Sequence, residues 1–327
     1  MNSLKHSITL YAFANKYANF EYSFEDCMRI AGELGADGIE LVGAQMLPSY
    51  PYCSPEFEAE FKNLVGKYNL KPVCYSAYID LGVRSDRDMN HAEIFDSTIR
   101  DLKIAKDLGF SILRSQYSIT PKIMEECLPY AEALGIHLAV EMHGPHVPKT
   151  PIWQEYLELF QRKNSPYIGI VPDMSSFLEI PPPTFLNNEP EGPEKKRFRK
   201  IVDAFCAEKE KDELLALNLD IGGGENGEAL IEELFYRYFR KHVDYPGLAA
   251  FLPYTKYIHG KFYYVNEQLE SPGIDYSRIV GIIKDSGFTG YIASEYEGDQ
   301  FDLELDEIDQ IKRHILMMKK LWSECRR

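Results

Sequence analysis

The sequence is poor in three features that would mark a specialised class of protein: cysteine, long apolar runs and positive charge. Its 327 residues include six cysteines, and no two of them form a Cys-x-x-Cys pair. They are Cys27, Cys53, Cys74, Cys127, Cys206 and Cys325. This scatter is typical of reduced thiols and argues against a disulfide scaffold.

Long apolar runs are missing as well. No stretch approaches the roughly 20 apolar residues that a bilayer-spanning helix needs. The apolar run at 8–13 is too short for the core of a signal peptide. We therefore expect a cytoplasmic protein with no membrane partner.

Positive charge is also scarce. The chain has 36 Lys and Arg against 51 Asp and Glu, a formal net charge of −15. That balance argues against a phosphate backbone or an anionic membrane as the main partner, so we expect no nucleic acid partner. It suits a neutral small-molecule substrate, or an acidic site that a metal cation neutralises.

What the chain does have is an alternation of short apolar runs with helical patterns. Strands are expected at 7–13, 38–42, 72–79, 111–115, 137–141 and 168–172, with helices at 26–34, 55–68, 91–108, 121–134 and 153–161. Gly35, Gly109 and Gly135 stand at helix-to-strand junctions. Repeated β-α units of roughly 30 residues predict a parallel sheet, either doubly wound or closed into a (β/α)₈ barrel.

The rest of the chain fits the barrel if it carries a long helical insertion at about 177–252, after the fifth strand. Within it we expect a charged helix over 194–213 and an aromatic-rich helix over 228–243. The aromatic run 235–239 is expected as a core stripe of that helix, with a partner surface or an aromatic substrate wall as the alternative. The pattern resumes with strands at 257–265 and 291–295, a helix at 274–286 and a closing helix at 305–322. The seventh strand gives no clear signal and is expected as a short piece near Ile274. We predict one barrel domain over 1–327.

Four expected strands end in a side chain that can bind a metal: Glu141, Asp173, His259 and Glu295. A barrel places its active site at these strand ends. Three carboxylates and an imidazole would repel one another there without a cation. This donor set favours one divalent metal, Mn²⁺ first, with Mg²⁺ or Co²⁺ as alternatives. The competing interpretation is that the acidic residues merely cap the following helices.

The order Glu…Asp…His…Glu, with His259-Gly-Lys261 and Gly290-Tyr-Ile-Ala-Ser-Glu295, resembles the xylose-isomerase-like TIM-barrel superfamily of sugar phosphate isomerases and epimerases. The resemblance covers nearly the whole chain. It implies that the four residues are metal ligands at the ends of the fourth, fifth, sixth and eighth strands. Two departures stand out. Asp173-Met-Ser-Ser176 lacks the histidine of the epimerases' Asp-x-x-His, and His259-Gly-Lys-Phe262 lacks a final acid.

His143 follows Glu141 by two residues, so in an extended strand both point to the same face. A neutral imidazole there is a natural general base. It could instead orient a carboxylate or add a metal ligand. Lys261 faces the same side as His259, where it could stabilise an enolate oxygen or pair with a carboxylate. The substrate-binding candidates at other strand ends and loops are Arg114, Gln116, His146 and Tyr11, with Glu40, Tyr78 and Asp80.

The long insertion and the Ser-Glu-Tyr-Glu-Gly298 segment most resemble the large (alpha) subunits of C-glycoside deglycosidases. That resemblance implies a metal-dependent lyase that removes the aglycone from 3-oxo sugar glycosides by β-elimination, together with a small β-rich partner subunit. His143, Glu141, Glu295 and Lys261 would be catalytic, with His143 taking the proton at C2. The alternative is a metal-dependent ketose 3-epimerase or sugar isomerase that works through an enediolate. A catalytically silent sugar-binding barrel is a third hypothesis.

Overall fold

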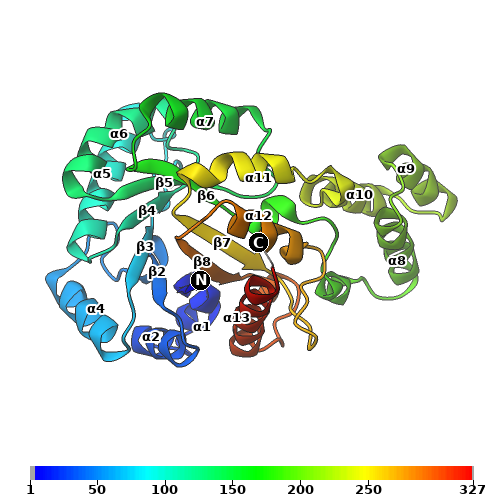
Figure 1. Cartoon of the computed structure of the whole chain (residues 1–327). Helices are drawn as coiled ribbons and strands as arrows, with labels where there is room; N and C mark the ends of the chain where they lie inside the picture. Colours follow the sequence, from blue (N-terminus) through cyan, green and yellow to red (C-terminus); the bar gives the residue numbers. More distant parts are fainter. Residues whose placement is uncertain (1–3, 326–327) are drawn as a thin grey trace.

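The structure, a computed structural model, describes residues 4–325 and is built on eight parallel strands (Figure 1). They are β1 (Lys5–Thr9), β2 (Gly38–Val42), β3 (Pro72–Ser76), β4 (Ile112–Ser115), β5 (His137–Met142), β6 (Ile168–Pro172), β7 (Tyr257–Phe262) and β8 (Tyr291–Tyr296). They pair in the order β6-β5-β4-β3-β2-β1-β8-β7. Isolated bridges, Ile170 with Thr255 and Asp173 with His259, join β6 to β7 and close the circle. The predicted (β/α)₈ barrel is confirmed.

The expected count of strands was wrong by one. The strand over Tyr257–Phe262 pairs directly with Tyr291–Tyr296, so no strand lies between them. Ile274 instead makes an isolated antiparallel bridge to Leu178. The four strands of the predicted metal site are therefore the fifth to the eighth. The insertion accordingly follows the sixth strand, β6.

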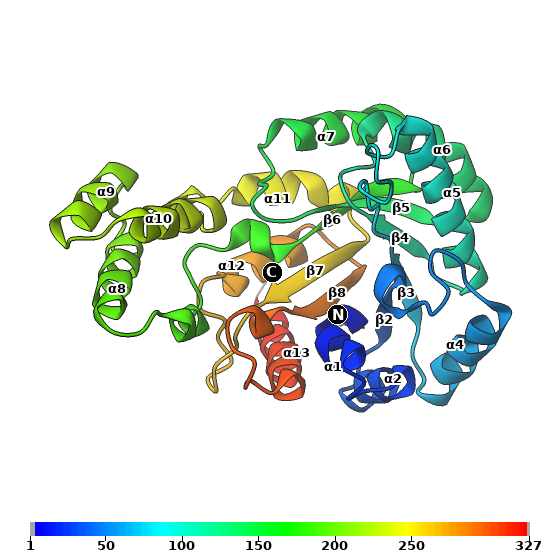
Figure 2. The same ribbon diagram turned by 180° about the vertical axis from the view of Figure 1, so that it is seen from behind.

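Helices surround the sheet (Figures 1 and 2). They are α1 (Ala14–Ala18), α2 (Phe24–Glu33), α3 (Gly43–Met46), α4 (Pro55–Lys67), α5 (His91–Asp107), α6 (Pro121–Leu134), α7 (Pro151–Lys163), α8 (Pro193–Cys206), α9 (Lys211–Asp220), α10 (Glu225–Arg237), α11 (Tyr245–Phe251), α12 (Tyr276–Asp285) and α13 (Glu307–Glu324). Capping boxes begin α2 at Ser23 and α5 at Asn90. Of the helices within residues 4–325, none combines the length and apolar content needed to cross a bilayer.

Three helices of the insertion, α8 to α10, form an arm that projects to one side of the barrel (Figures 1 and 2). We call residues 193–237 the arm. The charged helix expected over 194–213 is in fact broken, because Glu208 adopts a positive φ of 60° between α8 and α9. The aromatic-rich helix ends at Arg237, earlier than expected. After the arm, α11 returns to the barrel and packs against β6 and α12.

The inside of the barrel is filled by a small cluster of apolar side chains, separate from the larger core between strands and helices. Ala139, Val171, Tyr257 and Ala293 belong to this inner cluster. Because strand side chains alternate between the two faces, residues two and four positions further along also point inward. This alternation places the polar ends of β5 to β8 over one inner surface.

Candidate metal centre

The four predicted metal ligands converge at the C-terminal ends of the strands. Glu141 and Glu295 lie near the ends of β5 and β8, Asp173 directly follows β6, and His259 lies in β7. All four side chains are buried, and one donor atom of each lies within 4.8 Å of the others. Each residue stands two positions after a member of the inner cluster, which explains why they meet.

The His259 ring is held on both sides by carboxylates. Its Nδ1 lies 2.5 Å from Glu141 Oε1 and 3.1 Å from Glu295 Oε2, and its Nε2 lies 2.9 Å from Glu40 Oε2. Ser76 Oγ donates a short hydrogen bond to the other oxygen of Glu40. Burial alone would lower the pKa of His259, but Glu295, Glu40 and Glu141 raise it well above the usual value. Glu40, a substrate-binding candidate from the sequence, thus contacts the back of the ring.

Lys261 lies between three carboxylates. Its Nζ is 2.9 Å from Asp173 Oδ2, 2.9 Å from Glu297 Oε1 and 3.8 Å from Glu295 Oε2. Burial would lower the pKa of this ammonium group, but the carboxylates raise it well above 10.5, so Lys261 is charged. Glu297 was not predicted as a site residue, although alternation from Glu295 placed it on the same face.

Arg114, at the end of β4, brings a second buried cation. Its Nη2 donates to Glu141 Oε2 at 2.6 Å, and its guanidinium carbon lies 5.4 Å from the centre of the Tyr78 ring. Its Nε and Nη1 groups are buried and have no hydrogen-bond partner in the structure. Buried donors of this kind are costly unless a ligand satisfies them.

These residues fit a divalent cation. Five buried carboxylates, from Glu40, Glu141, Asp173, Glu295 and Glu297, face two permanent cations, Arg114 and Lys261. Asp173 Oδ2 and Glu295 Oε2 are buried and accept no hydrogen bond, although Lys261 is near. A cation among the four donors would add a direct contact to these two oxygens, beside their ion pairs with Lys261. Carboxylate oxygens with one imidazole are a donor set for Mn²⁺, Mg²⁺ or Co²⁺.

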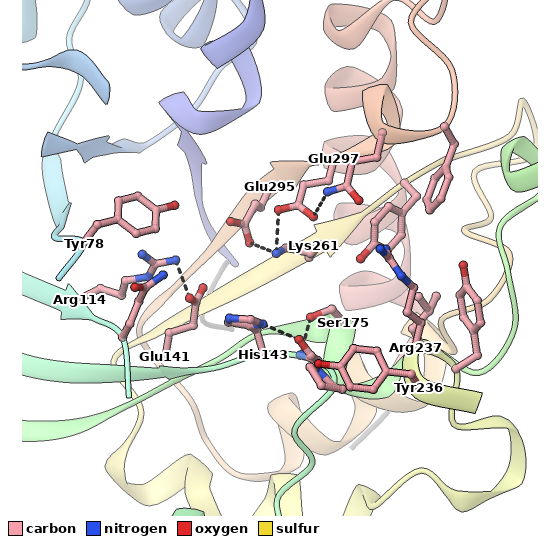
Figure 3. Close-up of a pocket in the computed structure, with 18 residues that line it drawn as sticks. Tyr78, Arg114, Glu141, His143, Ser175, Tyr236, Arg237, Lys261, Glu295 and Glu297 are labelled. Atoms are coloured by element: carbon pink, nitrogen blue, oxygen red, sulfur yellow. Dashed lines mark hydrogen bonds and ion pairs between the residues drawn. The ribbon is translucent and has the colours of Figure 1, made fainter. Parts of the chain in front are cut away.

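A cavity of about 390 Å³ opens above this cluster (Figure 3). Seven of the predicted site residues line it: Tyr78, Arg114, Gln116, Glu141, His143, Lys261 and Glu295. Tyr236 and Arg237, at the end of the arm, and Tyr238, which follows it, line the cavity too. They belong to the aromatic run 235–239, for which a substrate wall was the alternative to a helix core stripe. In Figure 3, Tyr236 and Arg237 lie on the side of the cavity opposite Tyr78 and Arg114. The volume is in the range of small-molecule sites.

His143 follows β5 and is half-buried at the cavity wall beside Glu141 (Figure 3). Its Nδ1 lies 2.5 Å from the carbonyl oxygen of Gly144. A carbonyl only accepts, so Nδ1 carries the hydrogen, and in the neutral ring the lone pair is on Nε2. Gly144 is itself fixed, because its N–H donates to Ser175 Oγ at 2.9 Å. The ring is therefore held in the tautomer that a general base needs.

Four predicted substrate-binding residues lie outside the residues that line this cavity: Tyr11, Glu40, Asp80 and His146. Asp80 is exposed and accepts a hydrogen bond from the Gly82 N–H at 3.0 Å. His146 packs between Tyr117 and Trp153, with ring centres 5.1 and 5.8 Å apart. Tyr11 is not at a strand end, because β1 stops at Thr9 and a 3₁₀ turn, η1 (Leu10–Phe13), follows. The pKa of Tyr11 is raised, mainly by burial and then by Glu297.

Comparison with known proteins identifies the family of this barrel. The family model described as "Xylose isomerase-like TIM barrel" matches residues 28–321. The 3'-dehydrocarminate deglycosidase alpha subunit of a Microbacterium species is 32% identical, over 97% of this chain and 95% of that protein. A C-glycoside deglycosidase alpha subunit of Arthrobacter globiformis is 29% identical, over 93% and 87%. Among solved structures, D-allulose 3-epimerase from a Methylomonas species aligns with a TM-score of 0.56 at 14% identity, over 98% and 99%. The chain belongs to the xylose isomerase-like TIM barrel family and is an enzyme of that family.

Proposed function

We propose that this member of the xylose isomerase-like TIM barrel family is the alpha subunit of a C-glycoside deglycosidase, a metal-dependent lyase that acts on 3-oxo glycosides. The observation that carries the proposal is His143, a single tautomer-fixed imidazole beside the convergent Glu141, Asp173, His259 and Glu295. The relatives named deglycosidase alpha subunits, which match nearly the full chain, support the same assignment.

The four convergent residues would hold the cation, with Mn²⁺ our first choice. When bound, a divalent cation polarises a carbonyl oxygen and so makes the hydrogen on the neighbouring carbon more acidic. Arg114 would donate its two unpartnered N–H groups to sugar oxygens, and Gln116 lines the cavity for the same purpose. Lys261, held by Asp173 and Glu297, would place a positive charge near the sugar carbonyl.

His143 would do the proton transfer. Its Nε2 takes the proton from sugar C2, a double bond forms between C1 and C2, and the bond from C1 to the aglycone breaks. The electron pair of that bond stays with the aglycone atom, which needs a proton. The imidazolium of His143 carries the proton just taken and can deliver it, so the elimination balances without a further reactant.

A sugar 3-epimerase or isomerase is the second candidate, because Glu141 and Glu295 reach the centre from two different strands. Two bases on different sides of a substrate are what epimerisation at one carbon requires. We place it second because the third residue after Asp173 is Ser176, whose hydroxyl donates to the Met142 carbonyl at 3.4 Å. That position holds no imidazole.

The deciding experiment incubates the purified protein with Mn²⁺ in D₂O, with a 3-oxo C-glucoside in one reaction and a ketose in another. We expect release of the free aglycone from the glucoside, measured by chromatography. Deuterium at a retained sugar carbon of the ketose, with no aglycone released, would replace the lyase by the epimerase. The relatives' designation as alpha subunits makes a second chain part of the proposal. The assay is therefore also run with a co-purified partner.

A further inference from the structure

The end of the arm brings two exposed side chains, Tyr236 and Arg237, to the cavity. The residue that follows them is buried and packed. Tyr236 is 63% exposed, and the Arg237 side chain is 46% exposed. The next residue, Tyr238, is buried and packs against Phe185 and Phe205 with ring centres 6.0 and 6.2 Å apart. Because Tyr238 is held by this packing, the backbone positions of Tyr236 and Arg237 beside the cavity are set as well.

The backbone beyond them is fixed to the barrel. Phe239 N–H donates to the Leu178 carbonyl and Arg240 N–H to the Glu179 carbonyl, both at 2.8 Å. Leu178 directly follows η2 (Met174–Phe177), the turn that Asp173 begins. The end of the arm is therefore tied to the same segment that supplies one of the candidate metal ligands.

Arg237 differs from the two other cations that line the cavity. Arg114 and Lys261 are buried and paired with the carboxylates of the metal centre. Arg237 pairs with Glu233 of its own helix at 3.2 Å, and both side chains are largely exposed. Exposed pairs of this kind are weak, so a ligand carboxylate can take the place of Glu233 at little cost.

We infer that Tyr236 and Arg237 form a subsite for the aglycone, and that the preferred aglycone is an aromatic ring bearing a carboxylate. The ring would lie against Tyr236, and the carboxylate would accept two hydrogen bonds from the Arg237 guanidinium. This inference rests on the proposed function. It adds the chemical class of the leaving group and assigns its recognition to the arm.

The kinetic test compares two 3-oxo C-glucosides, one with a resorcinol aglycone and one with a 2,4-dihydroxybenzoate aglycone. Arg237→Gln should lower kcat/KM for the carboxylated substrate roughly ten- to hundredfold, mainly through KM, because a charge-assisted hydrogen bond is lost. Activity on the resorcinol glucoside should change less than about threefold. Arg162→Gln is the matched control, because it removes an exposed arginine that pairs with Glu125 and does not line the cavity.

A binding measurement keeps the inference separate from the proposed function. The Mn²⁺-loaded protein is titrated with free resorcinol and free 2,4-dihydroxybenzoate by calorimetry, which needs no turnover. The wild type should bind the carboxylate tenfold or more tightly than resorcinol, and Arg237→Gln should lose this preference. A preference that persists in Arg237→Gln would place the carboxylate elsewhere, and no preference in the wild type would overturn the inference. If these results hold while no 3-oxo glucoside is cleaved, the proposed lyase activity fails and the subsite stands.

Discussion

The charged residues of the metal centre and those of the arm are treated in opposite ways by the fold. At the ends of β5 to β8, Glu141, Asp173, His259 and Glu295 are almost fully removed from solvent. In the arm, pairs such as Lys211 with Glu232 are 41% and 63% exposed. Burying charge is expensive and exposing it costs little, so buried charge that does not aid folding indicates chemistry. The charges of these arm pairs lie at the surface, where they cost little to keep.

The largest effect is expected at His143, which lines the cavity between the metal centre and the end of the arm. His143→Ala should lower kcat by about 10²- to 10⁴-fold, the usual contribution of a general base, while metal binding is retained. His91→Ala removes an exposed histidine paired with Glu126 and should leave kcat unchanged. Unchanged kcat in His143→Ala, measured with the substrate that the wild type turns over, would show that another group takes the proton.

A buried carboxylate outside the metal centre should affect the free energy of unfolding and its dependence on pH. Asp101, in α5, is almost fully buried, and neither carboxylate oxygen accepts a hydrogen bond. Burial raises its pKa from 3.8 to about 7, with Arg100 opposing the rise. Between these two values the unfolded chain releases the proton and the folded protein keeps it. Its contribution to the free energy of unfolding therefore falls as pH rises from about 4 to about 7, by up to roughly 1.4 kcal/mol per pH unit.

Asp101→Asn removes this titration. Melting temperatures at pH 5 and pH 8 should show that the variant loses less stability than the wild type on going to the higher pH. An equal change in both proteins would mean that Asp101 ionises in the folded protein much as it does in the unfolded chain.

A variant of Glu40 tests whether the carboxylate that contacts His259 Nε2 contributes to metal affinity. Glu40→Gln should weaken Mn²⁺ binding about 10- to 100-fold, because the carboxylate that fixes the His259 ring and its tautomer is lost. Titration calorimetry with Mn²⁺ measures this directly. Glu126→Gln breaks an exposed carboxylate–histidine pair, with His91, and should leave the affinity unchanged. Equal affinities in both variants would reduce Glu40 to a packing residue.

The smallest effect is expected in the arm. Lys211→Gln breaks the 2.7 Å ion pair between α9 and α10. Because the pair is exposed, the melting temperature should shift by no more than about 2 °C. A fall of more than about 5 °C would show that the exposed ion pairs of the arm stabilise the fold strongly. It would contradict the distinction between them and the buried charges of the metal centre.

The site could be predicted where it depends on strand alternation alone. Glu141, His143, His259, Lys261 and Glu295 follow from short apolar strands that end in polar residues, and the structure places all five around one centre. The barrel was predicted from the repeated β-α units of roughly 30 residues. Gly35, Gly109 and Gly135 all adopt positive φ, as expected where a helix ends and a strand follows. Gly287, between α12 and β8, does the same.

The features that the sequence did not reveal depend on contacts between residues far apart in the chain, or on where a helix ends. The pairing of β7 with β8 leaves no room for the strand expected near Ile274. The contact of Glu40 with His259 crosses the barrel from β2 to β7, which local sequence does not encode. The aromatic run around Arg237 stood out in the sequence, but the arginine itself did not, because its place at the cavity wall depends on where α10 ends.

Metal content tests the central claim most directly. The purified wild-type protein is loaded with Mn²⁺, desalted and analysed by mass spectrometry of the metal, beside Glu295→Gln and the arm variant Lys211→Gln. We predict one tightly bound divalent ion per chain in the wild type and in Lys211→Gln, and a loss of most of it in Glu295→Gln. Circular dichroism checks that all three proteins are folded. A folded wild type that retains no divalent metal, or a folded Glu295→Gln that retains as much as the wild type, would contradict a metal centre at these four strand ends.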